Sequence, residues 1–503
     1  MTVTADDVVQ LAAKPLLGAF DSLDWKSLTP TEGAVGLETI SSAAPSVVAA
    51  ANTVELSHKR LADIDQSKLV PQIAEPLSAA QKQLDELRGT LNVASNTVQL
   101  LPAMMGSETP RNYLLLIQNS AEARAMGGIP GALTVLTAKE GKIELTAQAS
   151  ASELGAFVPA LKVDSAQEAI YTNRLGSYMQ NVTMTPDFPT AALTAQTMWQ
   201  QRHPGDAIDG VITIDPSALA IVLGATGAVD VADAIPEGVD IGTLPTKLDK
   251  NNLVQALLSG VYANIEDPAL QDAYFAKVAE KIFTEVSSGN TSGEKLVTAL
   301  GEAVADNRIK VWSAHQNEQK LLNTQKIGGA ISGPSVPAAA FGVYFNDGTG
   351  AKMDYYVKRT VQLVQHCTQG GYGQYTARIT LKNTAPADAA TSLPKYVTGG
   401  GAFGVTPGNV ATNVVVYGPS QARTQAARLD GTEIPISSYT HAERPVGLTR
   451  VELTPGQTVT VEVDFAKVVQ TGTPHLDVTP TVQKTTEVVL PAELAANCGT
   501  PAN

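Results

Sequence analysis

The chain has 503 residues, of which 44% are hydrophobic and 17% charged, so it can bury several cores. Its net charge of -14 argues against a polyanion such as nucleic acid as the main partner, because phosphate binding requires a basic face. No run of eighteen or more apolar residues occurs, so we expect neither a transmembrane helix nor a signal peptide in this chain.

Residues 1–105 have a helical pattern. Between residues 77 and 101 apolar residues recur at spacings of three and four, and residues 47–61 repeat that spacing. The prolines of "DIDQSKLVPQIAEP" separate the two series. The pattern predicts an antiparallel helical hairpin that packs mainly on itself as a stalk. His58 lies on one stripe and is expected to be a packing residue rather than a ligand.

Residues 106–330 alternate short apolar runs with helical segments. The expected strands lie near residues 112–119, 131–138, 142–149 and 208–215. The expected helices lie near residues 190–203, 216–226, 251–265 and 272–288. Interleaving of this kind predicts an α/β domain with helices on the faces of a sheet.

Residues 331–503 alternate apolar and polar residues in short segments separated by glycine, proline, asparagine and aspartate. This pattern predicts an immunoglobulin-like antiparallel β-sandwich. The glycine-rich segment 397–409 lacks a lysine and a following helix, so we interpret it as a turn rather than a phosphate loop. The chain as a whole is therefore expected to be a multidomain α+β protein.

Common catalytic motifs are missing: the sequence has no G-x-S-x-G, no H-E-x-x-H, no Walker lysine loop and no cysteine pair at zinc spacing. His315 and Glu318 lie one helical turn apart, but no third ligand is evident, so a solvated helix face is the simpler interpretation. The metal ligands therefore stay unknown.

Residues 111–145 resemble the opening of the domain-of-unknown-function-4012 family, in which a strand, N-x-x-E-x-R, a Gly-Gly turn, a second strand and Gly-Lys follow in order. Later blocks agree with the resemblance, among them "MTPDFPTAA", "IDGVITIDPSAL" and "NDGTGAKMDYYVKRTV". The matching residues of the opening are Asn119, Glu122, Arg124, Gly127, Gly128, Gly131, Gly141 and Lys142.

That family in turn resembles the LytR-CpsA-Psr glycopolymer transferases of bacteria, and "IDGVITIDPSALAIVLGATGAVDV" carries the likeness. The resemblance implies an extracytoplasmic protein, anchored by an N-terminal segment outside this chain, that handles lipid-linked or cell-wall glycopolymer. It also implies a possible phosphotransferase activity on polyprenyl-(pyro)phosphate-linked polymer, with a divalent cation such as Mg²⁺ as a candidate cofactor. The alternative is a non-catalytic scaffold or binding module that docks envelope proteins.

The resemblance and the residue chemistry together suggest a site. Its catalytic candidates are Arg124, Asp187 and Glu122, and its substrate-binding candidates are Asn119, Gly127, Gly128, Arg174 and Arg202. An arginine beside glycine amides can hold an anion.

Each candidate has a structural alternative. Arg124 could pair with Glu122 or Asp187 and brace the loop. Asp187 could cap the helix after "TPDFP" instead of binding a metal, and Asp215 is expected to cap a helix.

Cys367 and Cys498 are the two cysteines of the chain. In an exported protein an even count indicates a bridge, whereas in a cytosolic protein both would be free. We predict a Cys367–Cys498 disulfide. Mass spectrometry with and without reductant, on protein folded under oxidising conditions, should show a difference of two hydrogens; two free thiols would rule the bridge out.

Overall fold

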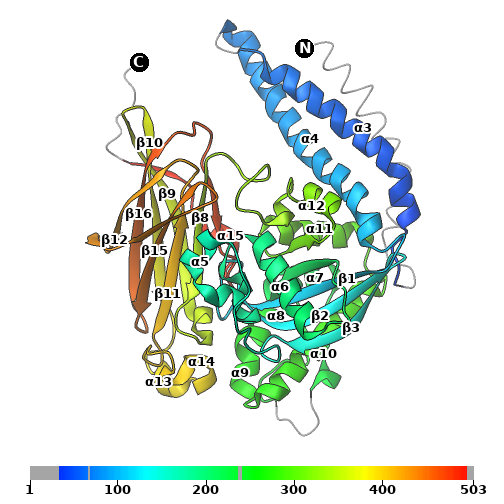
Figure 1. The fold of residues 1–503 in the computed structure, drawn as a ribbon, viewed down its shortest axis with the longest axis vertical. Coiled ribbons are helices and arrows are strands. Elements are labelled where there is room, and N and C mark those ends of the chain that lie inside the picture. The colour runs from blue at the N-terminus through cyan, green and yellow to red at the C-terminus, as the bar shows by residue number, and fades with distance from the viewer. Residues whose placement is uncertain (1–32, 66–67, 236–240, 496–503) are drawn as a thin grey trace. The chain divides into compact units, whose positions relative to one another are not determined.

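The computed structural model describes residues 33–65, 68–235 and 241–495. Within them it has the α+β composition expected from the sequence: an N-terminal helical hairpin, a mixed α/β sheet with its helices, and a β-rich C-terminal region (Figure 1). Cys498 lies outside the described residues, so the predicted disulfide remains a prediction.

The hairpin consists of α3 (Leu37–Ala62) and α4 (Pro71–Met104). Their antiparallel register follows from the contacts that join them: Gln81 Nε2 donates to the Leu61 carbonyl at 2.6 Å, and His58 Nε2 lies 3.4 Å from Asp85 Oδ1. His58 thus belongs to the packing between the helices, as predicted. The apolar core is supplied by the hairpin itself: Ala50, Ala51, Val54, Leu61, Leu77, Leu84 and Leu91.

The described part of the hairpin forms one compact unit with Leu136–Leu145 and Thr284–Val297. Within this unit, the amide of Gly141 donates to the Met105 carbonyl at 2.9 Å, and the amide of Val35 donates to the Gly141 carbonyl at 3.0 Å. The hairpin ends are therefore hydrogen-bonded to the turn after β2. That the hairpin projects as a stalk remains a prediction.

The central sheet has the strand order β3-β2-β1-β4-β7. Strands β1 and β4 are parallel and β4 and β7 antiparallel, so the sheet is mixed. Its strands are β1 (Arg111–Asn119), β2 (Ile129–Lys139), β3 (Lys142–Ser150), β4 (Gly210–Ile214) and β7 (Lys310–Ser313). A separate two-stranded sheet pairs β5 (Val229–Asp230) with β6 (Lys247–Leu248).

The helices of this region are α5 (Ser165–Tyr171), α6 (Phe188–Arg202), α7 (Pro216–Thr226), α8 (Leu253–Gln255), a π-helical turn η7 (Ala256–Gly260), α9 (Val261–Asn264), α10 (Pro268–Ser287), α11 (Gly293–Ala305) and α12 (Gln316–Leu322). The four predicted helical segments correspond to α6, α7, α8 to α9, and α10, whereas α5, α11 and α12 were not predicted. One face of the sheet packs on α6 through a core that contains Leu114, Leu116, Phe188, Met198 and Trp199. Because side chains alternate along a strand, the neighbouring positions of β1 face the opposite side.

Asp215 caps α7, as expected from the sequence. Its Oδ1 accepts from the amide of Ala218 at 2.7 Å, and its Oδ2 accepts from Arg308 Nη1 at 2.6 Å. The guanidinium of Arg308 also donates to the carbonyls of Thr481 and Gln483, both at 2.9 Å. This buried ion pair joins the start of α7 to a C-terminal segment.

The β-rich region has two packed sheets, with strand orders β13-β12-β16-β10-β9-β18 and β14-β15-β11-β8-β17. Side chains of both sheets fill the core between them, for example Phe341 and Phe465. The strands are β8 (Ala340–Asp347), β9 (Val357–Gln369), β10 (Tyr372–Asn383), β11 (Val410–Tyr417), β12 (Arg423–Leu429), β13 (Thr432–Ile434), β14 (Ser437–His441), β15 (Arg444–Leu453), β16 (Thr458–Val468), β17 (His475–Val478) and β18 (Glu493–Leu494).

The prediction of a purely antiparallel region is wrong. The edge strands β17 and β18 pair in parallel with β8 and β9. One-turn helices also occur between the strands: α13 (Ala389–Ser392), α14 (Lys395–Thr398) and α15 (Thr485–Val488).

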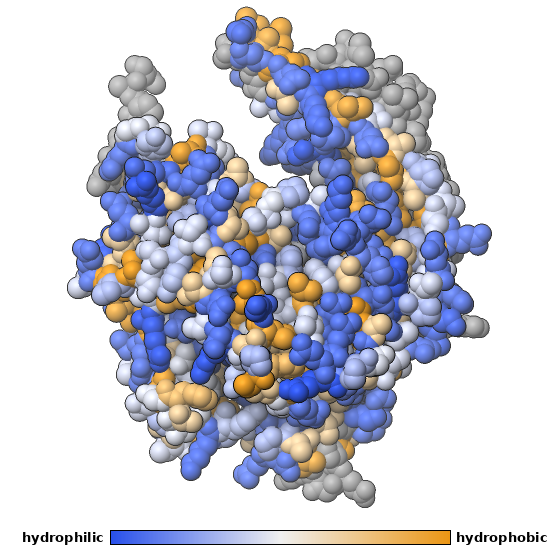
Figure 2. Space-filling view, viewed as in Figure 1, coloured by the Kyte–Doolittle hydropathy of each residue, from blue (hydrophilic) through white to orange (hydrophobic). Residues whose placement is uncertain are grey.

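The face shown in Figure 2 is mostly hydrophilic, with apolar residues in small groups, in keeping with the acidic composition. Within the described segments, no helix combines the length and the apolar character that a membrane span requires.

Candidate functional site

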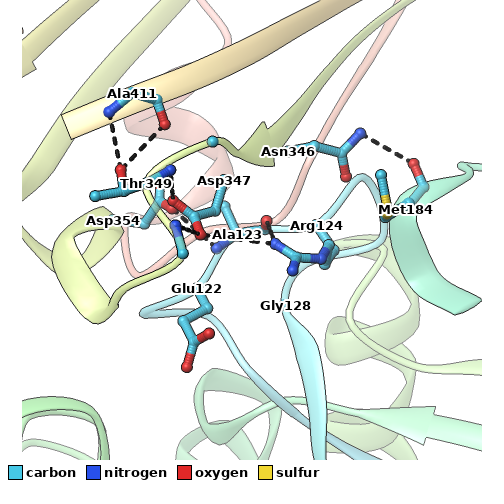
Figure 3. A network of polar contacts seen from close by, with 12 residues as sticks. Glu122, Ala123, Arg124, Gly128, Met184, Asn346, Asp347, Thr349, Asp354 and Ala411 are labelled. Atoms are coloured by element: carbon cyan, nitrogen blue, oxygen red, sulfur yellow. Dashed lines mark hydrogen bonds and ion pairs between the residues drawn. The ribbon is translucent and has the colours of Figure 1, made fainter. Parts of the chain in front are cut away.

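The loop between β1 and β2 docks against the β-rich region. The amide of Ala123 donates to Asp354 Oδ2 and the amide of Ala125 donates to Asn346 Oδ1, both at 3.0 Å. Asn346 lies near the end of β8 and Asp354 in the 3₁₀ turn that follows it, and both appear beside the loop in Figure 3. All of these residues belong to one compact unit. The polar loop between two apolar runs is thus a strap whose backbone is satisfied by side chains distant in sequence.

The loop glycines are required by packing. Gly127 has φ +134°, and a Cβ there would lie 2.5 Å from Gln118 Oε1; a Cβ on Gly128 would lie 2.3 Å from the Asn119 carbonyl. Their amides are already used, because Gly127 N donates to the Arg124 carbonyl at 2.7 Å and Gly128 N donates to Gln118 Oε1 at 2.9 Å. The expected anion-binding role of these two amides therefore has a competing structural explanation.

Arg124 is buried and faces Asp347. Its Nη1 donates to the Ala123 carbonyl at 3.0 Å and lies 3.9 Å from Asp347 Oδ2. Burial raises the pKa of Asp347 to about 7, and the neighbouring Asp354 carboxylate adds to the effect while Arg124 opposes it. The observed geometry favours the bracing alternative, with Asp347 as the partner in place of Glu122 or Asp187.

A cavity of about 550 Å³ lies beside β1, β2 and β3, on the face of the sheet that carries Ile117. Its volume falls in the range of ordinary small-molecule sites, roughly 300–1,000 Å³. All of its lining residues belong to the same compact unit as the strap. The apolar lining includes Ile117, Ala132, Leu219, Leu257, Leu258 and Phe275.

The cavity wall includes the π-helical turn η7, which separates α8 from α9 and carries Leu257 and Leu258. π-Helical turns are rare in proteins, and those that occur often lie at functional sites.

The cavity lining includes a polar cluster that centres on Lys352. Its Nζ donates to Glu122 Oε1 and lies 4.7 Å from the centre of the Tyr262 ring and 4.8 Å from that of Tyr396. Tyr262 in turn accepts a hydrogen bond from Asn119 Nδ2. Two residues predicted from the sequence, Glu122 and Asn119, are therefore brought together at the cavity.

The Glu122–Lys352 pair is ionised. Burial alone would raise the pKa of Glu122, but the Lys352 ammonium and its hydrogen bond hold that pKa below the usual value. Burial also acts to lower the pKa of Lys352, and Glu122 more than offsets it, so the ammonium form is favoured. Burial raises the pKa of Tyr262 to about 12, so its hydroxyl keeps its proton.

The other predicted site residues lie elsewhere. Asp187 precedes α6, where its Oδ2 accepts from the Thr190 hydroxyl at 2.7 Å, so it occupies the predicted capping position without a side-chain bond to a helix amide. Arg202 donates to the carbonyls of Leu154 and Ala156, both at 2.8 Å, and ties the end of α6 to that loop. Arg174 is exposed in the turn after α5.

The pair His315 and Glu318 does not form a common site. His315 Nε2 lies 2.9 Å from Asp209 Oδ1, whereas Glu318 Oε2 accepts from the Ser313 hydroxyl at 2.6 Å. Among the residues that the structure describes, no group of three or more His, Cys, Asp or Glu side chains is arranged to hold a metal ion. The Mg²⁺ expectation therefore has no assigned ligands.

Sequence reasoning missed Lys352, Tyr262 and Gln271 in the lining. Lys352 lies in "NDGTGAKMDYYVKRTV", a block that resembles the DUF4012 family, but this lysine was not among the predicted site residues. Lys352 is separated from Glu122 by 230 residues, and only the docking of the strap brings the two side chains together.

Residues 108–262 match the family model described as "Protein of unknown function (DUF4012)", as predicted from the sequence. The chain is also distantly similar to several solved structures. The Lin1025 protein from Listeria innocua is 14% identical at a TM-score of 0.25, over 43% of this chain and 78% of that chain. The gbs0355 protein from Streptococcus agalactiae is 14% identical at a TM-score of 0.28, over 45% of this chain and 76% of that chain.

The transcriptional regulator EF0465 from Enterococcus faecalis is 18% identical at a TM-score of 0.26, over 45% of this chain and 74% of that chain. TM-scores this low do not support any inference about function. None of the curated proteins is significantly similar to the chain.

The strap glycines give the first prediction from this site. Gly128→Ala should destabilise the fold by about 1–3 kcal/mol, because its Cβ would overlap the Asn119 carbonyl. The matched control is Gly131→Ala, since a Cβ there meets nothing within 4 Å. Urea unfolding compares the two. Equal stabilities would show that Gly128 is not required for packing.

The Glu122–Lys352 pair gives a second prediction. An acid whose pKa is lower in the folded protein stabilises the fold above its unfolded pKa, here near 4.5, and that stabilisation is lost as the pH falls through the folded pKa. Glu122→Gln should therefore lower stability at pH 7 by about 3 kcal/mol, because Lys352 loses its partner, and should make stability less dependent on pH below 4.5.

Urea unfolding from pH 7 to pH 3.5 measures both effects, with Glu168→Gln on the exposed side of α5 as the control. If the Glu122 and Glu168 variants lose stability in parallel with the unmodified protein as the pH falls, the pair does not contribute as inferred.

Proposed function

We propose that this chain, whose residues 108–262 match the DUF4012 family model, is a bacterial cell-envelope protein that binds a lipid-linked glycopolymer or its precursor. The apolar lining of the cavity beside β1 and β2 would hold the hydrocarbon chain, and the polar cluster around Lys352 would hold the first polar groups of the ligand. The proposal includes the extracytoplasmic location expected from the sequence, a glycopolymer-transferase-like α/β domain and an immunoglobulin-like β-rich region.

The single observation that carries the proposal is that one cavity has both apolar lining residues and the polar cluster around Lys352. Leucine, isoleucine and phenylalanine side chains gain free energy by covering hydrocarbon, at roughly 25 cal/mol per Å² of apolar surface removed from water. A fully polar metabolite would leave the apolar lining uncovered. An amphiphile with a long apolar chain satisfies both parts of the cavity.

The polar part of the lining favours hydroxyl-rich groups. The described lining carries three carboxylates, Glu122, Glu153 and Asp272, and one ammonium, Lys352. Burial raises the pKa of Asp272, and the nearby Glu153 carboxylate adds to it. A lining with more acids than bases repels a polyanion. Saccharide hydroxyls can donate hydrogen bonds to carboxylates, and they can both donate to and accept from side-chain amides.

Amide side chains strengthen this interpretation. The lining also contains Gln118, Asn119, Gln148, Gln180 and Gln271. Lys352 is the cation that could contact a phosphate next to the saccharide, sharing its donors between that phosphate and Glu122. Arg124, Arg174 and Arg202, which were expected to bind the pyrophosphate, lie outside the described lining. The proposal therefore concerns binding, and transfer of the polymer is a further hypothesis.

The competing function is a scaffold that binds envelope proteins and no lipid. The docked strap supports it, because a buried network that locks two regions together is also what a rigid scaffold needs. Filling the cavity separates the two functions, since a scaffold does not use it.

Ala276→Trp on α10 should fill part of the cavity and weaken binding of a polyprenyl-linked saccharide by about tenfold or more. The matched control is Ala263→Trp, an exposed position on α9 next to Tyr262 that lies outside the described lining. Binding is measured by native mass spectrometry and by fluorescence titration with polyprenyl-linked disaccharide, polyprenyl phosphate and polyprenol.

The expected order of affinity is polyprenyl-linked disaccharide first and polyprenol last. Equal affinity of the two tryptophan variants, or no binding of any of the three lipids, would contradict the proposal and favour the scaffold.

A further inference from the structure

A second cavity, of about 190 Å³, is lined by residues of β7, β17 and the segment 329–337, and by Ala125 and Met126 of the strap. Its lining does not overlap that of the larger cavity. All of its residues belong to the compact unit that contains the β-rich region. Its volume is below the roughly 300 Å³ at which ordinary small-molecule sites begin, so it suits a ligand of a few heavy atoms.

Two lysines line this cavity, one buried and one exposed. Lys310, on β7, is buried, and its Nζ donates to the Asn307 carbonyl at 2.9 Å. Lys326, in the 3₁₀ turn η8 (Lys326–Gly328), is exposed, and its Nζ donates to the Ala305 carbonyl at 2.7 Å. An ammonium group has three donors, so each of these lysines can make further hydrogen bonds.

The backbone holds Lys310 in place. Gly329 has φ +61°, and a Cβ there would lie 2.6 Å from Lys310 Cδ and 2.8 Å from Phe188 Cβ. Only glycine leaves room for the lysine stem at this point. Burial lowers the pKa of Lys310 to about 8; the nearby Lys326 adds to the lowering, and Asp477 opposes it.

One acid faces these cations. Asp477 Oδ1 lies 3.3 Å from His475 Nε2 and accepts from Asn307 Nδ2 at 3.2 Å. Burial alone would raise the pKa of Asp477, but His475 and Lys326 lower it to about 2, so the carboxylate is charged.

The remaining cation, Arg444, is engaged elsewhere. Its guanidinium donates to the carbonyls of Gly418, Ile331 and Ala340, at 2.9, 2.8 and 2.9 Å. The described lining thus carries the charges of Lys310, Lys326 and Arg444 against the single charge of Asp477, in a chain whose net charge is -14. A buried ammonium without a full set of counter-charges stabilises a bound anion, because little water competes for it.

We propose that this cavity is a second ligand site, which binds a small phosphate-type oxyanion, free or as a monoester, between Lys310 and Lys326. The oxyanion accepts from both ammonium groups, and the imidazole of His475 borders it. This site goes beyond the proposed glycopolymer binding and does not depend on it, because no residue is shared between the two cavities.

The test uses the full chain and titrates it with inorganic phosphate and with methyl phosphate by isothermal titration calorimetry, at ionic strength held constant with KCl. Lys310→Met and Lys326→Ala should each weaken phosphate binding by about tenfold or more, because each removes a charge-assisted hydrogen bond. Lys320→Ala, an exposed lysine on α12 outside the cavity, is the control and should change the affinity by less than about twofold.

Tighter binding of inorganic phosphate than of methyl phosphate indicates a site for the free ion, and the reverse order indicates a monoester site. Lys326→Ala decides the outcome if the Lys310 variant does not fold, since Lys326 is exposed. The proposal is overturned if the unmodified protein shows no saturable binding of either probe, or if Lys326→Ala binds as tightly as Lys320→Ala. Polyprenyl-saccharide binding, measured on the same variants, should not change.

Discussion

The α/β and β-rich regions share one buried hydrogen-bond network, in which the strap between β1 and β2 gives its backbone amides to Asp354 and Asn346. The return bonds run from the backbone of the β-rich region: the amide of Asp347 donates to the Ala123 carbonyl at 2.8 Å, and that of Asp354 donates to the Ala121 carbonyl at 3.1 Å. A buried backbone group without a partner is costly, so neither region can be separated here without leaving amides and carbonyls unpaired.

Both cavities depend on this docking. The strap places Glu122 beside Lys352 in the larger cavity, and its residues Ala125 and Met126 line the smaller cavity. The charge balance differs between the two. The larger cavity combines an apolar wall with more carboxylates than cations, whereas the smaller one has more cations than carboxylates. This contrast is the physical basis for assigning an amphiphilic saccharide to one and a small oxyanion to the other.

The positions of arginines in the sequence did not predict which residues line the cavity. Arg124, Arg202 and Arg308 all donate to backbone carbonyls, and the carboxylates near two of them belong to buried pairs. A guanidinium offers five donors in a fixed fork, which suits an anion and also suits several carbonyls at once. Sequence spacing does not distinguish these two uses, because the carbonyls that accept the bonds come from distant parts of the chain.

The sequence by itself determined the helical hairpin, the segments of the α/β region and the alternating strands, since these follow from periodicities of 3.6 and 2 residues along the chain. It also determined the DUF4012 match and the cap that Asp215 forms on α7, which are local patterns. Only the tertiary structure decided that β17 and β18 join their sheets in parallel, that Arg124 faces Asp347, and that Lys352 reaches Glu122 across 230 residues. Each of these contacts joins distant segments, and the free energy that selects it comes from burial and pairing of groups whose proximity no local pattern encodes.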